Sequence, residues 1–238
     1  YTLSDGTATD IATITITVTG INDPVVAVND TGSVNEDATL TVSDGSGDII
    51  ADNDTDADDS ASLVVSAIRL GGTEGSGTAG TLGQPLTGTY GQLTLNANGS
   101  YSYVANQSAA DDLDAGDTAT DVFNYTLSDG TATDIATITI TVTGINDAPV
   151  AQNDVGVINE DATLTVSNSA NANVSGSYDA TGEHSGDVIN TSSSSHTDSD
   201  PDDSASLVVS AIRLGGTEGS GTAGSIGSAL TGTYGQLT

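Results

Sequence analysis

The sequence lacks cysteine, methionine, tryptophan and lysine, and its only basic residues are Arg69 and Arg213. Without cysteine, no disulfide can stabilise the fold, and no thiolate is present to act as a nucleophile or a zinc ligand. The 33 acidic residues give a formal net charge of −31 at pH 7. A chain of this charge repels nucleic acid and anionic membrane surfaces, so we expect neither as a partner.

Long apolar runs are absent as well. No stretch approaches the roughly 18 consecutive apolar residues of a membrane span, and residues 1–10 lack the basic and apolar regions of a signal peptide. The two histidines, His184 and His196, stand among Ser and Asn residues, and no nucleophile motif accompanies them to form a catalytic set. We therefore expect no membrane insertion and no enzymatic activity.

Many acidic residues with few aromatic ones are also typical of disordered chains. Here, however, the acidic residues cluster in short runs, and the segments between the runs alternate Val, Ile and Tyr with Thr and Ser. Such alternation predicts strands with one buried face. Of the acidic residues, 28 are Asp and five are Glu, which favours carboxylates on loops over carboxylates on helices.

An internal repeat organises the chain. Residues 1–23, YTLSDGTATDIATITITVTGIND, recur without change at 125–147, and three further segments recur later: 38–43 at 162–167, 61–80 at 205–224, and 87–94 at 231–238. The later segments have a larger offset because 20 residues are inserted near 168–195. We interpret 1–23 as the C-terminal strands of a preceding repeat, 24–147 as a complete repeat, and 148–238 as a following repeat that is incomplete at its C-terminal end.

Strand patterns recur within each repeat, whereas helix patterns are nearly absent. Residues 13–18 alternate Ile and Val with Thr, which predicts a half-buried strand. The segment 93–103 predicts a hairpin that turns at Asn98-Gly99, and 123–142 predicts a second hairpin that turns at Ser-Asp-Gly. About six or seven strands per repeat predict an all-β fold of tandem antiparallel β-sandwich domains, of immunoglobulin or cadherin-like type.

Four segments carry a family resemblance: NDAPVAQND followed by NEDATLTV, then NDTDADDSASLVV, YGQLTLNANGSYSYV and FNYTLSDGTATDIATITITVTGINDAP. They resemble the VCBS and cadherin-like repeats of large bacterial adhesins and biofilm matrix proteins of the RTX-adhesin type. The resemblance covers the whole chain apart from the insertion. It implies an extracellular, calcium-loaded β-sandwich that is used in arrays for adhesion or matrix building.

Aspartates crowd one loop of each repeat. Two carboxylates about 4 Å apart repel by about 1 kcal/mol in water and by about 4 kcal/mol at an effective dielectric constant near 20. Calcium, which takes about six to eight oxygen ligands in irregular geometry, would reverse this repulsion. We therefore predict Ca2+ as the cofactor, with a merely solvated acidic loop as the alternative. The loop carboxylates are Asp52, Asp54, Asp56, Asp58 and Asp59 in the first copy and Asp198, Asp200, Asp202 and Asp203 in the second.

The loop is not an EF-hand, because Ala57 stands where a glycine is needed and Leu63 where the bidentate Glu should be. The ligands are therefore expected to come from separate segments, as in cadherin-like domains. The first predicted set combines the acidic loop with Asn22, Asp23 and Glu36, and the second combines Asn146, Asp147 and Glu160 with Asp198, Asp200 and Asp202. For Asp30, Asp37, Asp154 and Asp161, turn capping and metal ligation both remain open.

Two further features have structural interpretations. The segment GSGTAG at 75–80 matches the dinucleotide-binding pattern GxGxxG, but no helix pattern follows it, so we expect a bulged loop. Arg69 and Arg213 occupy equivalent strand positions, and each is expected to pair with a nearby carboxylate.

The function predicted from these features is that of a structural repeat segment in an extracellular calcium-binding adhesin or matrix filament at the bacterial cell surface. Calcium would stiffen the junctions between repeats. The expected partners are neighbouring repeats of the same chain, other copies in a fibre, and cell-surface or matrix ligands. Two alternatives remain: a carbohydrate- or protein-binding module of a secreted protein, and an accessory region of a secreted enzyme.

Overall fold

The structure, a computed structural model, describes residues 1–58, 62–153, 160–161, 163, 189, 198–202 and 206–238. The chain divides into two compact units. One comprises Tyr1–Ser33, Thr39–Val104 and Thr120–Thr141, and the other comprises Val34–Ala38, Ala105–Ala119 and Val142–Thr238. Apart from Ile189, the predicted insertion near 168–195 lies outside the described residues.

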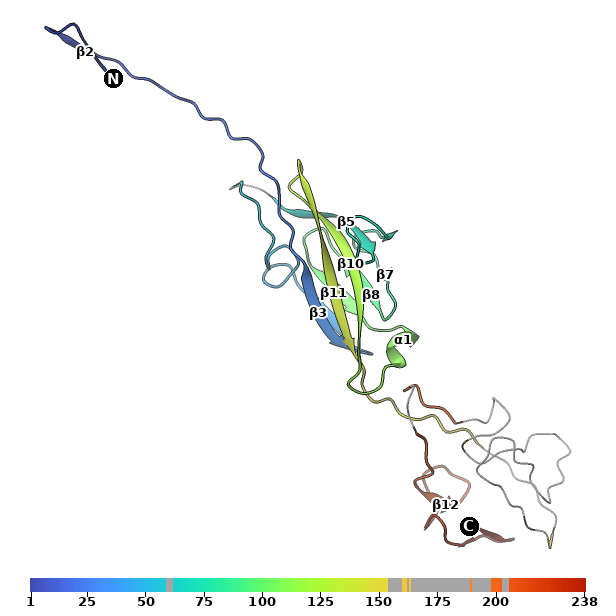
Figure 1. Cartoon of the computed structure of the whole chain (residues 1–238). Helices are drawn as coiled ribbons and strands as arrows, with labels where there is room; N and C mark the ends of the chain where they lie inside the picture. The colour runs from blue at the N-terminus through green and yellow to red at the C-terminus, as the bar shows by residue number, and fades with distance from the viewer. Residues whose placement is uncertain (59–61, 154–159, 162, 164–188, 190–197, 203–205) are drawn as a thin grey trace. The chain divides into compact units, whose positions relative to one another are not determined.

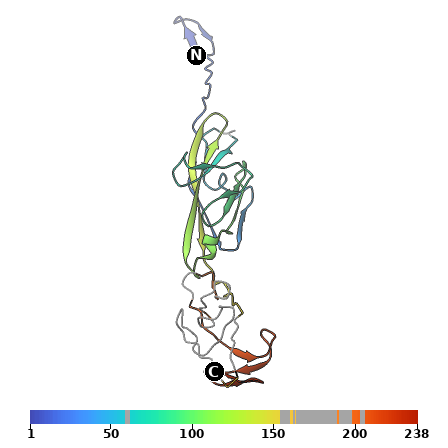
Figure 2. The ribbon, with the colours of Figure 1, turned by 90° about the vertical axis from the view of Figure 1, so that its right-hand side faces the viewer.

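Two sheets make up the complete repeat (Figures 1 and 2). The larger sheet has the order β3-β11-β10-β5-β6, with β3 at Asp30–Asn35, β11 at Thr133–Thr143, β10 at Thr118–Ser128, β5 at Val64–Leu70 and β6 at Thr78–Ala79. The smaller sheet has the order β4-β9-β8-β7, with β4 at Thr39–Val42, β9 at Tyr101–Val104, β8 at Gln92–Leu95 and β7 at Leu86–Thr87. The predicted all-β sandwich fold is confirmed.

Alternation of apolar and polar residues produces the core, as expected for strands with one buried face. In β11 the side chains of Ile138, Ile140 and Val142 are all 0% exposed, while the threonines between them face outward and are half-buried. The smaller sheet contributes buried residues such as Tyr103, whose ring packs edge-on against Phe123 of β10 with 6.5 Å between ring centroids. Burying each such aliphatic or aromatic side chain stabilises the fold by roughly 1.5–3 kcal/mol.

Both predicted hairpins are present. β8 pairs with β9 across a turn in which Gly99 has a φ of 89°, and β10 neighbours β11 across a turn in which Gly130 has a φ of 94°. Such positive φ angles favour glycine. A single helical turn, α1 at Ser108–Asp111, was not predicted.

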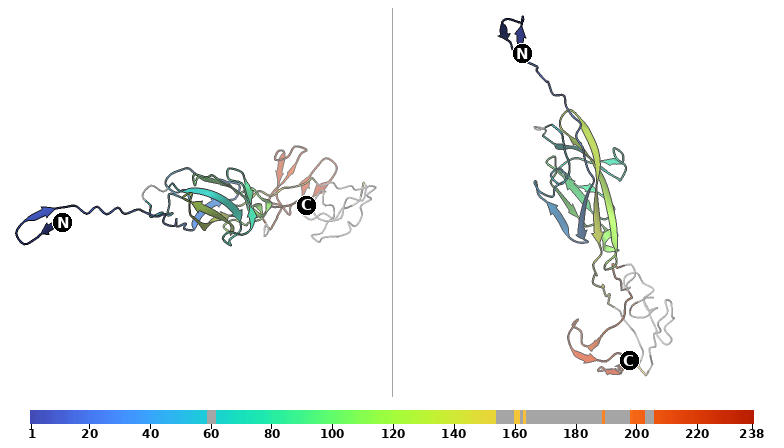
Figure 3. Two further views of the ribbon diagram at one scale, coloured as in Figure 1. Left: turned by 90° about the horizontal axis from the view of Figure 1, so that it is seen from above. Right: turned by 60° about the vertical axis from the view of Figure 1, so that its left-hand side comes forward.

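The strand predicted over residues 13–18 is wrong for this copy of the sequence. β1 (Thr2–Ser4) and β2 (Thr9–Ile11) pair as a short hairpin, but residues 12–21 form no strand, and Figure 3 shows them as an extended trace. Ile14, Ile16 and Val18 are 71%, 80% and 87% exposed. The physical reason is that a half-buried strand needs a neighbouring strand and an opposing sheet, which β11 has and which no described residues provide for this segment.

Residues 206–238 contain two short antiparallel pairs. β12 (Ile212–Leu214) pairs with β13 (Thr222–Gly224), and β14 (Leu230–Thr231) pairs with β15 (Gln236–Leu237). β12 and β13 repeat the pairing of β5 with β6, in which Arg69 lies opposite Ala79.

The expectation that each arginine pairs with a carboxylate is not met in the described part of the chain. Arg69 Nη1 donates to the carbonyl of Gly77 at 3.2 Å, and Arg213 Nη1 donates to that of Gly221 at 3.5 Å. The pairing of β5 with β6 brings the guanidinium against the glycine loop, whose Gly77 carbonyl accepts its hydrogen bond. A Cβ on Gly77 would lie 1.9 Å from the carbonyl oxygen of Leu70, so this loop, which leads into strand β6, requires glycine there.

Candidate functional site

Each repeat joins its entry linker to its acidic loop by the same backbone contact. Val26 and Thr55 form an isolated antiparallel bridge with N–O distances of 2.8 and 3.0 Å. Val150 and Ser199, their counterparts, form the same bridge at 2.7 and 3.0 Å. We call residues 22–28 with 52–58 the first acidic cluster, and residues 146–152 with 198–202 the second.

Backbone amides orient three aspartates in each acidic cluster. In the first, Asp54 accepts from Val28 N at 2.8 Å, Asp56 from Asp58 N at 2.8 Å, and Asp58 from Asp23 N at 2.9 Å. In the second, Asp198 accepts from Gln152 N at 2.7 Å, Asp200 from Asp202 N at 3.1 Å, and Asp202 from Asp147 N at 3.0 Å. Both clusters therefore present the same set of fixed carboxylates on a linker and a loop.

Glu36 belongs with the second acidic cluster, which corrects its predicted grouping with Asn22 and Asp23. It follows β3, and its backbone N donates to the carbonyl of Thr143, the last residue of β11, at 2.9 Å. Its side chain is 1% exposed, and Oε1 accepts a hydrogen bond from Ile145 N in the linker. The pairing of β3 with β11 thus carries Glu36 to the point where the linker begins.

Electrostatics at the second acidic cluster disfavour charge in the absence of a cation. Burial raises the pKa of the Glu36 carboxyl, and the neighbouring carboxylates of Asp147, Asp202 and Asp111 raise it further. The pKa of Asp147 is raised by desolvation first and then by Asp202 and other nearby carboxylates. Among the described residues, no basic side chain contributes to either shift.

Two buried carboxylate oxygens of this cluster have no hydrogen-bond partner in the described part of the chain: Glu36 Oε2 and Asp202 Oδ1. Asp202 is 9% exposed. An unpaired buried polar atom costs about 1–3 kcal/mol, and more when it is charged. In the first cluster, Asp56 Oδ2 is buried and unpaired in the same way.

These oxygens fit calcium, which binds carboxylate and carbonyl oxygens and tolerates irregular geometry. The fit is partial, because among the described residues no group of three or more His, Cys, Asp or Glu side chains is placed to hold a metal ion. An ion at the second acidic cluster would therefore take the rest of its ligands from backbone carbonyls, the Asn146 side chain and water.

A buried group beside the first acidic cluster was not predicted. The hydroxyl of Tyr125 donates to Asp30 Oδ2 at 2.9 Å and lies 3.3 Å from Asp54 Oδ2. Burial raises the pKa of Asp30 to about 7 and that of Asp54 to about 6. The sequence identifies Tyr125 only as an inward-facing strand residue, and no local signal shows that its hydroxyl reaches two carboxylates.

The remaining predicted ligands do not take part in the hydrogen bonds that join linker and acidic loop. Asn22 Nδ2 donates to Asp129 Oδ2 at 3.0 Å, and Asn146 Nδ2 donates to the carbonyl of Asp147. Asp52 and Glu160 are exposed. Asp37 and Asp161 occupy equivalent turns with φ angles of 58° and 64°. Asp59, Asp154 and Asp203 lie outside the described residues.

Comparison with known families agrees with this architecture. The family model of the bacterial cadherin-like domain matches residues 22–144, just over half of the chain. The chain belongs to this family. Cadherin-like domains are typically structural modules without enzymatic activity, and the bacterial ones occur in surface and extracellular proteins. The VCBS and RTX-adhesin part of the resemblance stays a prediction, and no curated protein matches the cadherin-like chain.

Among the described residues, no helix of this cadherin-like protein is long and apolar enough to cross a membrane.

Proposed function

We propose that this chain is a structural segment of an extracellular calcium-binding adhesin or matrix filament, in which calcium stiffens the junction after each cadherin-like repeat. The observation that carries the proposal is the pair of buried carboxylate oxygens on Glu36 and Asp202 that have no hydrogen-bond partner among the described residues. A carboxylate oxygen that is removed from water and given no donor is stable in its charged form only beside a cation.

The residues of the second acidic cluster suit a junction. The side chain of Glu36 accepts a hydrogen bond from Ile145 N in the linker. Asp147, two residues further along the linker, donates its backbone N to Asp202 in the acidic loop of the following repeat. Calcium bound by the Glu36 and Asp202 carboxylates would supply positive charge that also offsets their repulsion with the nearby Asp147 carboxylate. Bending the linker would then require these carboxylates to separate, so the binding energy would oppose the motion.

Thermal unfolding tests the calcium part of the proposal. Ligand binding to the native state alone adds about 2.7 kcal/mol at a concentration 100 times the Kd. We expect the unfolding midpoint of the 238-residue chain to rise by several degrees between excess EDTA and millimolar calcium. Equal midpoints in the two buffers would contradict calcium binding to the folded chain.

Small-angle scattering tests the stiffening part, at concentrations where the chain is monomeric. The variant Glu36→Gln/Asp147→Asn keeps both backbone hydrogen-bond geometries but removes two charges from the cluster. In calcium, the wild type is expected to show a longer and narrower distribution of interatomic distances than the variant, and in EDTA the two should coincide. Identical distributions in saturating calcium would remove the stiffening role while leaving calcium binding possible within a repeat.

A further inference from the structure

The hairpin between β8 and β9 turns at Asn98-Gly99, the only Asn-Gly pair in the sequence. Asn98 is exposed, and Gly99 has a φ of 89°. Asparagine is among the thermally labile residues, because the backbone nitrogen of the next residue can attack its side-chain amide. Glycine hinders this attack least, since it has no side chain and adopts many backbone conformations. The chain therefore places a reactive pair of residues at an exposed turn.

A serine hydroxyl polarises the amide of Asn98. Ser100 Oγ donates to Asn98 Oδ1 at 2.8 Å, and Asn96 Nδ2 donates to Ser100 Oγ at 3.1 Å. Attack on the Asn98 amide carbon places negative charge on Oδ1, and a donor that already points at this atom stabilises the charge. One hydrogen bond opposes the reaction, because Gly99 N donates to the carbonyl of Asn96 at 3.1 Å and must leave it before attacking.

We propose that Asn98 is a modification site at which the folded chain deamidates spontaneously, with assistance from the Ser100 hydroxyl. Gly99 N forms a bond to Cγ of Asn98 and loses its proton, and the amide nitrogen leaves as ammonia, which gives a cyclic succinimide. Water then opens the ring and is the only co-reactant. Opening at the side-chain carbonyl gives an ordinary aspartate. Opening at the backbone carbonyl gives isoaspartate, in which the main chain runs through the former side chain.

The turn between β10 and β11 also contains a glycine with positive φ but differs in its chemistry. Gly130 has a φ of 94°, and Asp129 precedes it. Asp129 Oδ1 accepts from Ala132 N and Thr131 N, and these hydrogen bonds lower the pKa of its carboxyl. An ionised carboxylate resists attack by a nitrogen nucleophile, so this second turn is expected to stay unmodified.

Isoaspartate at this turn would disturb the packing beneath it. Gly99 is buried, and its Cβ position lies 2.8 Å from Asp48 Oδ1 and 2.9 Å from Ile50 Cγ1. The carbonyl of Gly99 accepts from Ile49 N at 3.4 Å, and the Ile49 side chain is 1% exposed. An added main-chain atom must therefore displace residues that belong to the core. This slow, irreversible change loosens the smaller sheet and involves no calcium, so it goes beyond the proposed function.

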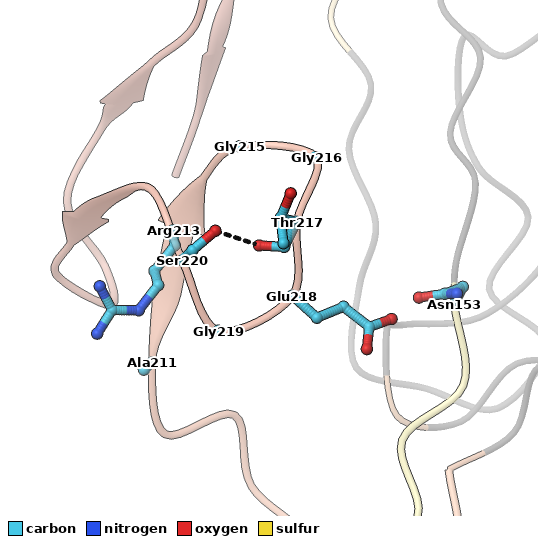
Figure 4. Close-up of a pocket in the computed structure, with 9 residues that line it drawn as sticks. All are labelled: Asn153, Ala211, Arg213, Gly215, Gly216, Thr217, Glu218, Gly219 and Ser220. Carbon is cyan, nitrogen blue, oxygen red and sulfur yellow. Dashed lines mark hydrogen bonds between the residues drawn. The ribbon is translucent and has the colours of Figure 1, made fainter.

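Peptide mapping by mass spectrometry tests the proposal, after the 238-residue chain is incubated in EDTA at mildly alkaline pH. We expect the mass change from amide to acid at Asn98, as a mixture of aspartate and isoaspartate. Asn96 and Asn153 are internal controls, because both are exposed and neither is followed by glycine. Figure 4 shows Asn153 across a hollow from the glycine loop 215–220. Both controls should keep their amides.

The variant Ser100→Ala tests the role of the hydroxyl. It should slow the loss of the Asn98 amide by about 5-fold, the effect of roughly 1 kcal/mol, which is a typical contribution of a neutral hydrogen bond. Ser102→Ala, which alters the next outward-facing serine of β9, is the matched control and should react as the wild type does. In denaturant all three proteins should react at one rate, because the hydroxyl contact then no longer exists.

Chemical denaturation of the separated products tests the structural consequence. The isoaspartate form should unfold at a lower denaturant concentration than the wild type. Asn98→Asp, which adds the same charge without lengthening the main chain, should unfold close to the wild type. The proposal is overturned if the folded chain loses the Asn98 amide no faster than the Asn96 amide, or if Ser100→Ala reacts at the wild-type rate. An isoaspartate form as stable as the wild type overturns the packing consequence. All of these measurements are made in EDTA, so their failure leaves the proposed function untouched.

Discussion

Residues 1–23 and 125–147 have the same sequence but different structures, and the comparison separates local from tertiary causes. The turn is the same in both. Asp5 Oδ1 accepts from the N atoms of Thr7 and Ala8, both at 2.8 Å, and Asp129 Oδ1 accepts from the equivalent atoms at 2.6 and 2.7 Å. Beyond the turn, 133–143 is the buried strand β11, whereas the equivalent residues end their strand at Ile11. The hydrogen bonds of the aspartate side chain stabilise the turn in both copies. The long strand forms only where neighbouring strands pair with it and bury its apolar face.

The largest expected effect is a loss of stability, which is tested by making the same substitution separately at equivalent positions of the two copies. Ile140→Asp puts a carboxylate at a position that is 0% exposed, and we expect it to destabilise the complete repeat by about 4 kcal/mol or more. Ile16→Asp, its counterpart at 80% exposure, should change stability by less than about 0.5 kcal/mol. Chemical denaturation at concentrations where the chain is monomeric checks this. Equal losses would mean that residues 1–23 are already packed within their own chain.

The next effect is a pH dependence of stability caused by two carboxyl groups of the complete repeat, Asp30 and Asp54. The pKa of Asp30 is raised to about 7 and that of Asp54 to about 6, from a model-compound value of 3.8. Between pH 4 and 7 the folded state therefore holds protons that the unfolded chain has released, and stability falls as pH rises through this window. In EDTA, the unfolding midpoint should rise on acidification from about pH 8 to about pH 5.

The variant Asp30→Asn is the control for this pH dependence, since it removes the group with the larger shift. In this variant, the unfolding midpoint should depend less on pH than in the wild type, mainly near neutral pH. A wild-type midpoint that falls steadily from pH 8 to pH 5 in EDTA has the wrong sign for carboxyl groups whose pKa is raised by burial, and would refute this assignment.

A smaller effect is expected from the tyrosine hydroxyl. Tyr125→Phe removes the donor to Asp30, which lies at 2.9 Å, and should cost about 1–2 kcal/mol. Tyr1→Phe alters an identical residue that is 63% exposed and should cost almost nothing. Thermal unfolding of both variants in EDTA measures the difference, and equal midpoints would show that the hydroxyl contact contributes nothing to stability.

The smallest effect concerns the insertion near 168–195, which the first repeat does not have. Because loop-closure cost grows slowly with length, deleting its 20 extra residues should leave the calcium-dependent unfolding transition unchanged. Loss of that transition would show that the insertion belongs to the core of the following repeat.

These comparisons also show what the sequence could predict. Residue alternation and turn residues are local, so the two hairpins and the inward faces of β8 to β11 could be predicted. The position of Glu36 could not, because it depends on the pairing of β3 with β11, more than a hundred residues away. Asp121 is a similar case. It lies within β10, is 3% exposed, and accepts from Thr89 N at 2.8 Å and from the Tyr103 hydroxyl at 2.6 Å, so its role is structural.

Calcium titration by calorimetry tests the central claim most directly, namely that the unpaired oxygens of Glu36 and Asp202 bind calcium. The variants Glu36→Gln and Asp202→Asn each remove one charge with little change in shape. Glu74→Gln, which alters an exposed glutamate, is the matched control. We expect the wild type and Glu74→Gln to bind calcium with the same stoichiometry, and each of the other two variants to lose one site or to weaken it by about 10-fold or more, the effect of roughly 1.4 kcal/mol. Unchanged affinity and stoichiometry in all four proteins would contradict the account.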